Sequence, residues 1–201
     1  GRDQSKLALA EKEGFKTILC DLGRQEDIES AVFFIHSHYP QINMLFNNAG
    51  VQCNYDFTSS VIPIKKISQE ININLTGQLI LTQLMIPILA KAPKAVIVNT
   101  TSGLGIFPKV DGLVYSAGKA AMRNFTTGLR YGLKNTSIRV LELIPPVTDT
   151  PMTKGRKTKK MSAAVLVDNI LPQLQKEKEI LTILPMVSSF FIIPIRLEKL
   201  L

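Results

Sequence analysis

Short apolar runs alternate along this chain with longer segments in which apolar residues recur at helical spacing. The apolar runs have the length of buried parallel strands, and they lie at 16–22, 43–46, 94–99, 137–144 and 179–184. Helical spacing occurs at 3–13, 25–38, 64–90, 115–133 and 162–176. This alternation, with its short connections, predicts an α/β fold in which helices cover both faces of a doubly wound parallel sheet.

Polar residues lie at the carboxyl ends of four of the predicted strands. They are Asp21, the NNAG sequence at 47–50, the TTS sequence at 100–102 and the PPVTDT sequence at 145–150. The carboxyl ends of parallel strands meet at one edge of a sheet, and ligands bind at that edge in open α/β sheets. The sequence therefore predicts a binding site built from these residues.

The length of 201 residues predicts one domain, spanning 1–201 and ending in an apolar tail at 183–201. Its most apolar run, at 183–195, is too short to cross a bilayer and contains Pro185 and Pro194, so no membrane span is expected. Cys20 and Cys53 are too few to indicate a disulfide framework, which favours a reduced, cytoplasmic setting. His36 and His38 do not share a helix face, and no metal site is predicted.

The net charge of +8 comes in part from the KGRKTKK sequence at 154–160. Such a surface suits nucleic acid, a membrane surface or an anionic small molecule. No aromatic residue interleaves with these basic residues, as base stacking on single strands would require, so a solvated loop is the favoured interpretation. A nucleic-acid or membrane-surface binder stays as an alternative, and the loop is also a candidate for favouring an anionic substrate.

Three side chains between 99 and 119 suggest proton-transfer chemistry. Tyr115 and Lys119 are four residues apart, so on a helix they lie on one face. A cation one turn away favours the phenolate and lowers the pKa of a tyrosine, which suits general acid/base catalysis. Ser102 precedes Tyr115 by thirteen residues and can donate a hydrogen bond to an oxygen that gains negative charge.

The sequence opens with a predicted helix, and no GxGxxG motif occurs in it. A first strand, its glycine-rich turn and the helix that would hold a pyrophosphate are therefore absent from the expected fold. We expect an N-terminally incomplete sheet, with unpaired strand edges facing each other. The favoured explanation is a fragment of a longer protein, and the alternative is a degenerate chain that binds cofactor poorly.

Together these motifs resemble the short-chain dehydrogenase/reductase family, and LELIPPVTDTPM resembles the subgroup named after D-alanyl-lipoteichoic acid operons. The matching sequences are CDL, NNAG, INLTG, TTSG, YSAGK and PPVTDT, in this order over nearly the whole chain. YxxxK alone is a weak signal, whereas the ordered set is very specific. The resemblance implies a Rossmann-like fold that lacks its first strand and first helix.

The resemblance also implies catalytic roles for four residues. Tyr115 would be the general acid/base, Lys119 would lower its pKa and hold the nicotinamide ribose, and Ser102 would polarise the substrate carbonyl. Asn74 would stabilise a local helix distortion and hold a water in a proton relay to Lys119. Cofactor contacts would come from Tyr115 and Lys119 and from Arg2, Asp21, Leu22, Asn48, Ala49, Gly50, Val147, Thr148 and Thr150.

These implications lead to a predicted function. The chain is expected to be an NAD(P)-dependent oxidoreductase that interconverts a small carbonyl compound and an alcohol by hydride transfer. Arg2 can meet a 2′-phosphate bidentately, which favours NADP over NAD. Relatives would pair as homodimers or homotetramers through the helices at 64–90 and 115–133. The alternative is a catalytically silent fragment or interaction module, because the pyrophosphate loop is absent.

Overall fold

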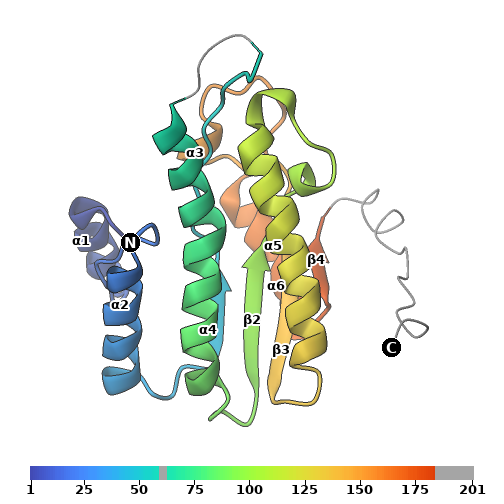
Figure 1. The fold of residues 1–201 in the computed structure, drawn as a ribbon. Helices are drawn as coiled ribbons and strands as arrows, with labels where there is room; N and C mark the ends of the chain where they lie inside the picture. The colour runs from blue at the N-terminus through green and yellow to red at the C-terminus, as the bar shows by residue number, and fades with distance from the viewer. Residues whose placement is uncertain (59–62, 184–201) are drawn as a thin grey trace.

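The computed structural model describes residues 1–58 and 63–183 (Figure 1). Within these residues one sheet of four parallel strands has the order β1-β2-β3-β4, comprising β1 (Met44–Asn47), β2 (Ala95–Thr100), β3 (Ile138–Ile144) and β4 (Ile180–Thr182). The register pairs Asn47 with Asn99 and Asn99 with Glu142. The carboxyl ends of β1, β2 and β3 therefore lie side by side, and the predicted parallel α/β fold is confirmed.

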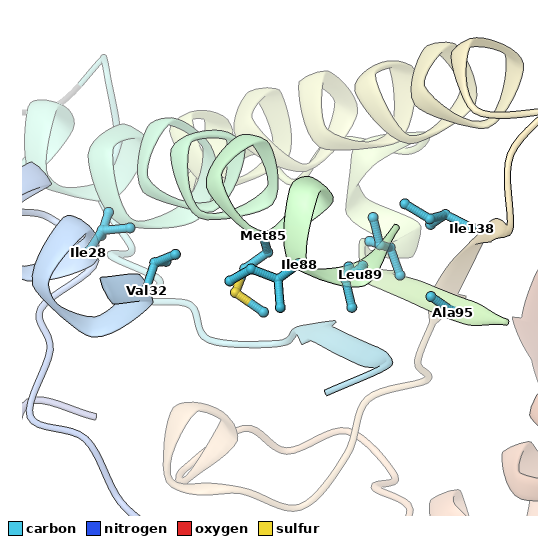
Figure 2. Packing of buried hydrophobic residues seen from close by; sticks show 8 residues of the cluster. Ile28, Val32, Met85, Ile88, Leu89, Ala95 and Ile138 are labelled. Carbon is cyan, nitrogen blue, oxygen red and sulfur yellow. The ribbon is translucent and has the colours of Figure 1, made fainter. Parts of the chain in front are cut away.

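The described residues form the helices α1 (Gln4–Lys12), α2 (Gln25–His38), α3 (Ile64–Ile71), α4 (Gly77–Leu89), α5 (Leu113–Gly132) and α6 (Ala163–Gln175). Of these, α4, α5 and α6 pack directly on the strands. In Figure 1, α4 and α5 lie in front of the strands, α2 lies to the left beside α4, and α6 lies behind the strands. Alternate side chains of β2 face these two layers. Ala95 and Ile97 join the core formed with α2 and α4 (Figure 2), whereas Val96 and Val98 pack toward α6.

The strand predicted at 16–22 is wrong. No strand forms there, none of its residues is buried, and Leu19 is 54% exposed. The Gly1 amino group donates to the Ile18 carbonyl (3.0 Å) and the Cys20 N–H donates to the Gly1 carbonyl (2.7 Å). These two hydrogen bonds make a single parallel pairing, whereas a β-strand requires a series of such hydrogen bonds along its length. The segment instead lies against α4, where a Cβ on Gly77 would overlap the Leu22 carbonyl oxygen.

The helix predicted at 64–90 contains an irregular turn. Between α3 and α4 the residues Asn72–Thr76 form a π-helix, so the stretch Ile64–Leu89 is continuous but locally widened. By length and composition it is the single helix in the described part of the chain that could cross a membrane. Glu70, Asn74 and Gln78 are buried in it, and it packs against α2 and α5, as a core helix does.

The other predicted elements are confirmed, with ends that differ by a few residues. The helix at 25–38 coincides with α2, and α5 begins at Leu113, two residues before the predicted start. The last strand is shorter than predicted, at Ile180–Thr182. Apart from Ile183, the predicted tail at 183–201 lies outside the described residues.

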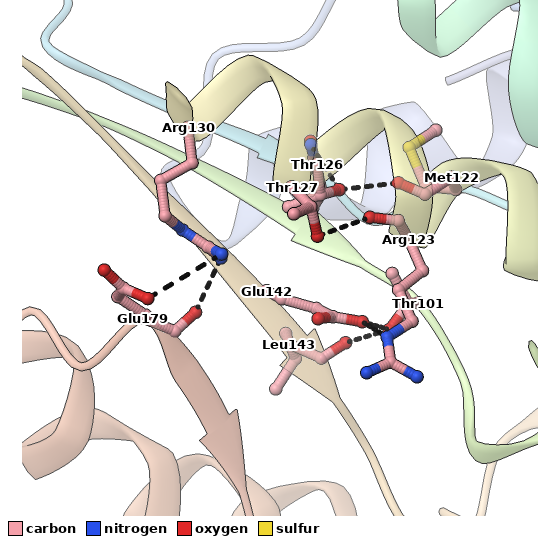
Figure 3. Close-up of polar contacts among 10 residues, drawn as sticks. Thr101, Met122, Arg123, Thr126, Thr127, Arg130, Glu142, Leu143 and Glu179 are labelled. Carbon is pink, nitrogen blue, oxygen red and sulfur yellow. Dashed lines mark hydrogen bonds and ion pairs between the residues drawn. The ribbon is translucent and has the colours of Figure 1, made fainter. Parts of the chain in front are cut away.

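Two arginines of α5 tie this helix to the sheet (Figure 3). Arg130 Nε donates to the Val140 carbonyl of β3 (2.9 Å), and Arg130 Nη1 lies 3.8 Å from a Glu179 carboxylate oxygen, just before β4. Arg123 Nε lies 3.7 Å from Glu142 Oε1, which also accepts from Thr101 Oγ1 (2.7 Å). The buried Glu142 carboxylate therefore fixes the residue that follows β2.

Candidate active site

Ser102, Tyr115 and Lys119 come together beyond the carboxyl end of β2. Tyr115 lies in the first turn of α5 with Lys119 one turn later, and they are 9% and 3% exposed. Lys119 Nζ donates to the Thr100 carbonyl (2.7 Å) and lies 5.7 Å from the centre of the Tyr115 ring. Ser102 follows β2 and accepts from the Leu104 N–H (3.1 Å), which caps the 3₁₀ turn Gly103–Gly105.

The 3₁₀ turn after Ser102 packs directly on the backbone of α5. A Cβ on Gly105 would lie 2.9 Å from the Lys119 carbonyl carbon and from the Ala120 nitrogen. Only glycine permits this approach without a shift of backbone. The turn therefore holds Ser102 over the segment of α5 that carries Tyr115 and Lys119.

The pKa values of this site are set mainly by burial. Burial raises the pKa of Tyr115, while its hydrogen bond with Ser102 and the charge of Arg156 lower that pKa and the charge of Glu70 raises it. Burial also lowers the pKa of Lys119 to about 8. The net direction for Tyr115 is opposite to that expected from Lys119 alone, because removing the phenolate from water outweighs the favourable charges.

Asn74 lies at the π-helical turn, 1% exposed, and its side chain clamps the segment that follows NNAG. Its Oδ1 accepts from the Val51 N–H (2.8 Å) and its Nδ2 donates to the Val51 carbonyl (2.7 Å). A Cβ on Gly50 would lie 3.3 Å from Asn74 Oδ1. Both polar groups of the side chain are thus engaged, and the relay to Lys119 stays a prediction.

The NNAG sequence is anchored to β2 and α4. Asn48 Oδ1 accepts from Thr100 Oγ1 (3.1 Å), and the Ala49 carbonyl accepts from Gln78 Nε2 (2.7 Å). Asn47, the first residue of NNAG, was given no role of its own in the prediction; it donates through Nδ2 to Asn99 Oδ1 and to Thr82 Oγ1, each at 2.8 Å. Asparagines in otherwise apolar strands were the signal that could have identified this buried network.

Near the N-terminus the structure brings Arg2 and Asp21 together, with Arg2 Nη1 3.2 Å from Asp21 Oδ2. The pKa of Asp21 is lowered, chiefly because the Gly23 N–H donates to its carboxylate and then because of Arg2. A cavity of about 350 Å³ opens beside Asp21 and reaches α3 and Asn72. Leu22 is half-buried and packs against the core of α2 and α4.

The residues after β3 that were predicted to contact the cofactor lie in hydrogen-bonded turns. Thr148 Oγ1 donates to the Pro146 carbonyl (3.0 Å), and Thr148 pairs with Met161 in an isolated bridge. Thr150 begins the 3₁₀ turn Pro151–Thr153, and its N–H donates to Thr153 Oγ1 (3.1 Å). Val147 is 38% exposed, so its side chain is available to a ligand at this edge.

Comparison with known proteins identifies the family of this chain. The family model of the short chain dehydrogenases matches residues 3–161. The chain belongs to the short chain dehydrogenase family. It is 33% identical over 190 residues to the oxidoreductase DltE of Bacillus subtilis, covering 90% of this chain and 75% of that one.

Other members of the family are more distant. Serine 3-dehydrogenase of Agrobacterium fabrum is 31% identical over 159 residues, covering 78% of this chain and 63% of the relative. A short-chain dehydrogenase of Sphingobium yanoikuyae, solved with NADPH, superposes with a TM-score of 0.82 at 22% identity and covers 95% of this chain and 78% of that one. As a family member, the chain is an NAD(P)-dependent oxidoreductase.

Two groups of residues in this short chain dehydrogenase have the chemistry to contact parts of a dinucleotide, and their assignment as cofactor contacts stays a prediction. The ionised Asp21 beside the cavity can accept from adenosine hydroxyls, and Lys119 with Tyr115 can meet the nicotinamide ribose. Among the described residues no glycine-rich turn begins a helix, so no group for the pyrophosphate is assigned. In the same residues, no cluster of His, Cys, Asp and Glu could hold a metal ion.

Two charged residues near Tyr115 escaped sequence analysis. Glu70 is fully buried and accepts from the Tyr55 hydroxyl (2.9 Å) and from the Cys53 N–H (3.2 Å). Arg156 donates through Nη2 to Gln52 Oε1. A charge inside the apolar helix was the signal for Glu70, whereas Arg156 lies in a run of cations from which the sequence does not single it out.

Proposed function

We propose that the chain interconverts a small carbonyl compound and an alcohol by hydride transfer, with Tyr115 as the general acid/base. The observation that carries the proposal is the meeting of Ser102, Tyr115 and Lys119 at the carboxyl end of β2. A bound nicotinamide cofactor would supply or accept the hydride at the reacting carbon. The chain's own residues would then handle the oxygen and its proton.

In the reducing direction Tyr115 gives its hydroxyl proton to the carbonyl oxygen as the new C–H bond forms. Because burial raises its pKa, the hydroxyl is protonated at neutral pH and is ready to act as an acid. Ser102 donates a hydrogen bond to the same oxygen, whose negative charge grows during the step. Lys119, fixed by the Thr100 carbonyl, places a cation beside the phenolate that remains.

We further propose that NADP is the preferred cofactor, with NAD as the alternative. Arg2 is half-exposed and pairs with Asp21, so its guanidinium is held where a 2′-phosphate would compete for it. Fluorescence titration of the full-length protein with NADPH and NADH tests both the preference for NADP and the assignment of Arg2. We expect tighter binding of NADPH and loss of that preference in Arg2→Ala. Equal affinities for the two cofactors would contradict the assignment of Arg2.

The same titration separates the enzyme from a catalytically silent interaction module. An absence of binding by either cofactor would favour the module. The alternative of a nucleic-acid or membrane-surface binder predicts affinity for DNA or anionic vesicles that falls steeply with salt. We also propose a cytoplasmic location, supported by two cysteines that are both free.

We propose a homodimer or homotetramer that pairs through α4 and α5. On α5 the exposed residues Ala117, Ala121, Asn124 and Gly128 follow one another at spacings of four, three and four, which gives a stripe of small side chains. A second helix can approach such a stripe closely. Analytical ultracentrifugation should show an oligomer in the wild type and a monomer in Ala121→Arg, and unchanged assembly in that variant would contradict the interface.

A further inference from the structure

Arg156 is carried by an anchored segment and not by a free loop. After β3 the chain runs to Met161 and returns, with the Asp149 N–H donating to the Met161 carbonyl (2.8 Å) and the Met161 N–H donating to the Val147 carbonyl (2.9 Å). Within the segment that these two hydrogen bonds close, the Arg156 N–H donates to the Thr153 carbonyl (3.1 Å). The backbone of Arg156 is therefore fixed relative to the end of β3.

The Arg156 side chain reaches across the site to the segment that follows β1. Its Nη2 donates to Gln52 Oε1, a contact between residues 104 positions apart. Gln52 lies over the start of α5, because a Cβ on Gly112 would be 3.3 Å from Gln52 Nε2. Gly112 precedes Tyr115 by three residues. The Arg156 and Gln52 pair therefore lies beside the start of α5, near enough to Tyr115 for the charge of Arg156 to lower the pKa of its hydroxyl.

The charge of Arg156 has no anionic partner among the ion pairs of the described residues. Its side-chain hydrogen bond goes to a neutral amide, which leaves other N–H groups of the guanidinium available. The charge acts on Tyr115, whose pKa it lowers. Glu70 is the nearby carboxylate, but Tyr55 and Cys53 already donate to it.

We propose that Arg156 determines substrate specificity by binding a carboxylate, so that the substrates are oxo acids and the corresponding hydroxy acids. This inference rests on the proposed function, since it names the substrate class for the same site. A guanidinium matches a carboxylate through two parallel hydrogen bonds, and a partly buried location strengthens them. Binding at Arg156 would place the rest of the acid against Tyr115 and Ser102.

The test compares acetoacetate with its neutral methyl ester in steady-state kinetics of the full-length protein with NADPH. Arg156→Gln should lower kcat/KM about 10- to 100-fold for the acid and leave that for the ester within about threefold. Arg156→Lys should recover part of the loss. Any change in the pKa of Tyr115 affects both substrates, so it cancels in the ratio of acid to ester. Arg139→Gln, on an exposed position of β3, is the matched control and should leave the ratio unchanged.

Binding of 3-hydroxybutyrate and of its methyl ester, followed by ligand-observed NMR, gives a readout that does not need turnover. We expect the wild type to bind the acid more tightly than the ester and Arg156→Gln to lose that difference. Binding with this pattern but no turnover would support Arg156 and overturn the proposed oxidoreductase reaction. Wild-type protein that binds acid and ester equally, or a variant that loses both alike, would overturn the carboxylate site.

Discussion

The buried ammonium of Lys119 should make the stability of this protein depend on pH in a predictable way. Lys119 is 3% exposed, its Nζ donates to the Thr100 carbonyl, and burial lowers its pKa from 10.5 to about 8. Between these two pH values the unfolded chain binds more protons at this residue than the folded chain does. The free energy of unfolding should therefore rise with pH through the window from about 8 to 10.5.

The magnitude follows from the two pKa values. Each pH unit inside the window adds at most about 1.4 kcal/mol, and integration from pH 7 to pH 9.5 gives a gain of about 2 kcal/mol from this one side chain. The raised pKa values of Tyr115 and of both cysteines act in the opposite direction at alkaline pH. A variant that removes only the ammonium is needed to isolate the contribution of Lys119.

Lys119→Met keeps a side chain of similar length without a charge. Urea unfolding followed by circular dichroism at pH 7, 8, 9 and 9.5 measures the free energy of unfolding of both proteins. The difference, wild type minus variant, should increase by about 2 kcal/mol across this range. A difference that stays constant or declines with pH would refute the lowered pKa of Lys119.

Two further perturbations test the packing around the site. Gly105→Ala should lower the free energy of unfolding by about 1–3 kcal/mol, because its Cβ would lie 2.9 Å from the Lys119 carbonyl carbon. Gly128→Ala, on the helix α5 that carries Lys119, has no heavy atom within 4 Å of its Cβ and should raise the free energy of unfolding by about 0.5–1 kcal/mol. Similar changes in thermal unfolding for both variants would contradict this contact. Burial raises the pKa of Glu142, so from pH 4.5 to 7 the wild type should lose stability relative to Glu142→Gln in urea unfolding. A relative gain would show that Arg123 outweighs the burial.

The sequence was sufficient to predict the strands and helices that carry a clear apolar run or stripe. The strands at 94–99 and 137–144 and the helix at 25–38 were predicted closely, because each presents a continuous apolar run or a helical stripe. The run at 16–22 is also largely apolar but forms no strand. Strand formation depends on a hydrogen-bonded neighbour, and composition carries no information about whether one is present.

The candidate site could also be predicted only in part from the sequence. The positions of Tyr115 and Lys119 followed from their spacing on one helix face. The direction of the Tyr115 pKa did not, because it depends on how far the fold removes the hydroxyl from water. The contact between Arg156 and Gln52 joins loops 104 residues apart, and no local pattern could have predicted it.

The role of Tyr115 is tested most directly by replacing it with phenylalanine. The Tyr115→Phe variant keeps the aromatic ring and removes only the hydroxyl that Ser102 contacts. With the full-length protein, turnover of a carbonyl substrate should fall by about 10²- to 10⁴-fold, because the proton donor is lost. The dissociation constant for NADPH, measured by fluorescence, should stay within about threefold of the wild-type value. A variant that binds NADPH normally and turns over at the wild-type rate would contradict the assignment of Tyr115 as the general acid/base.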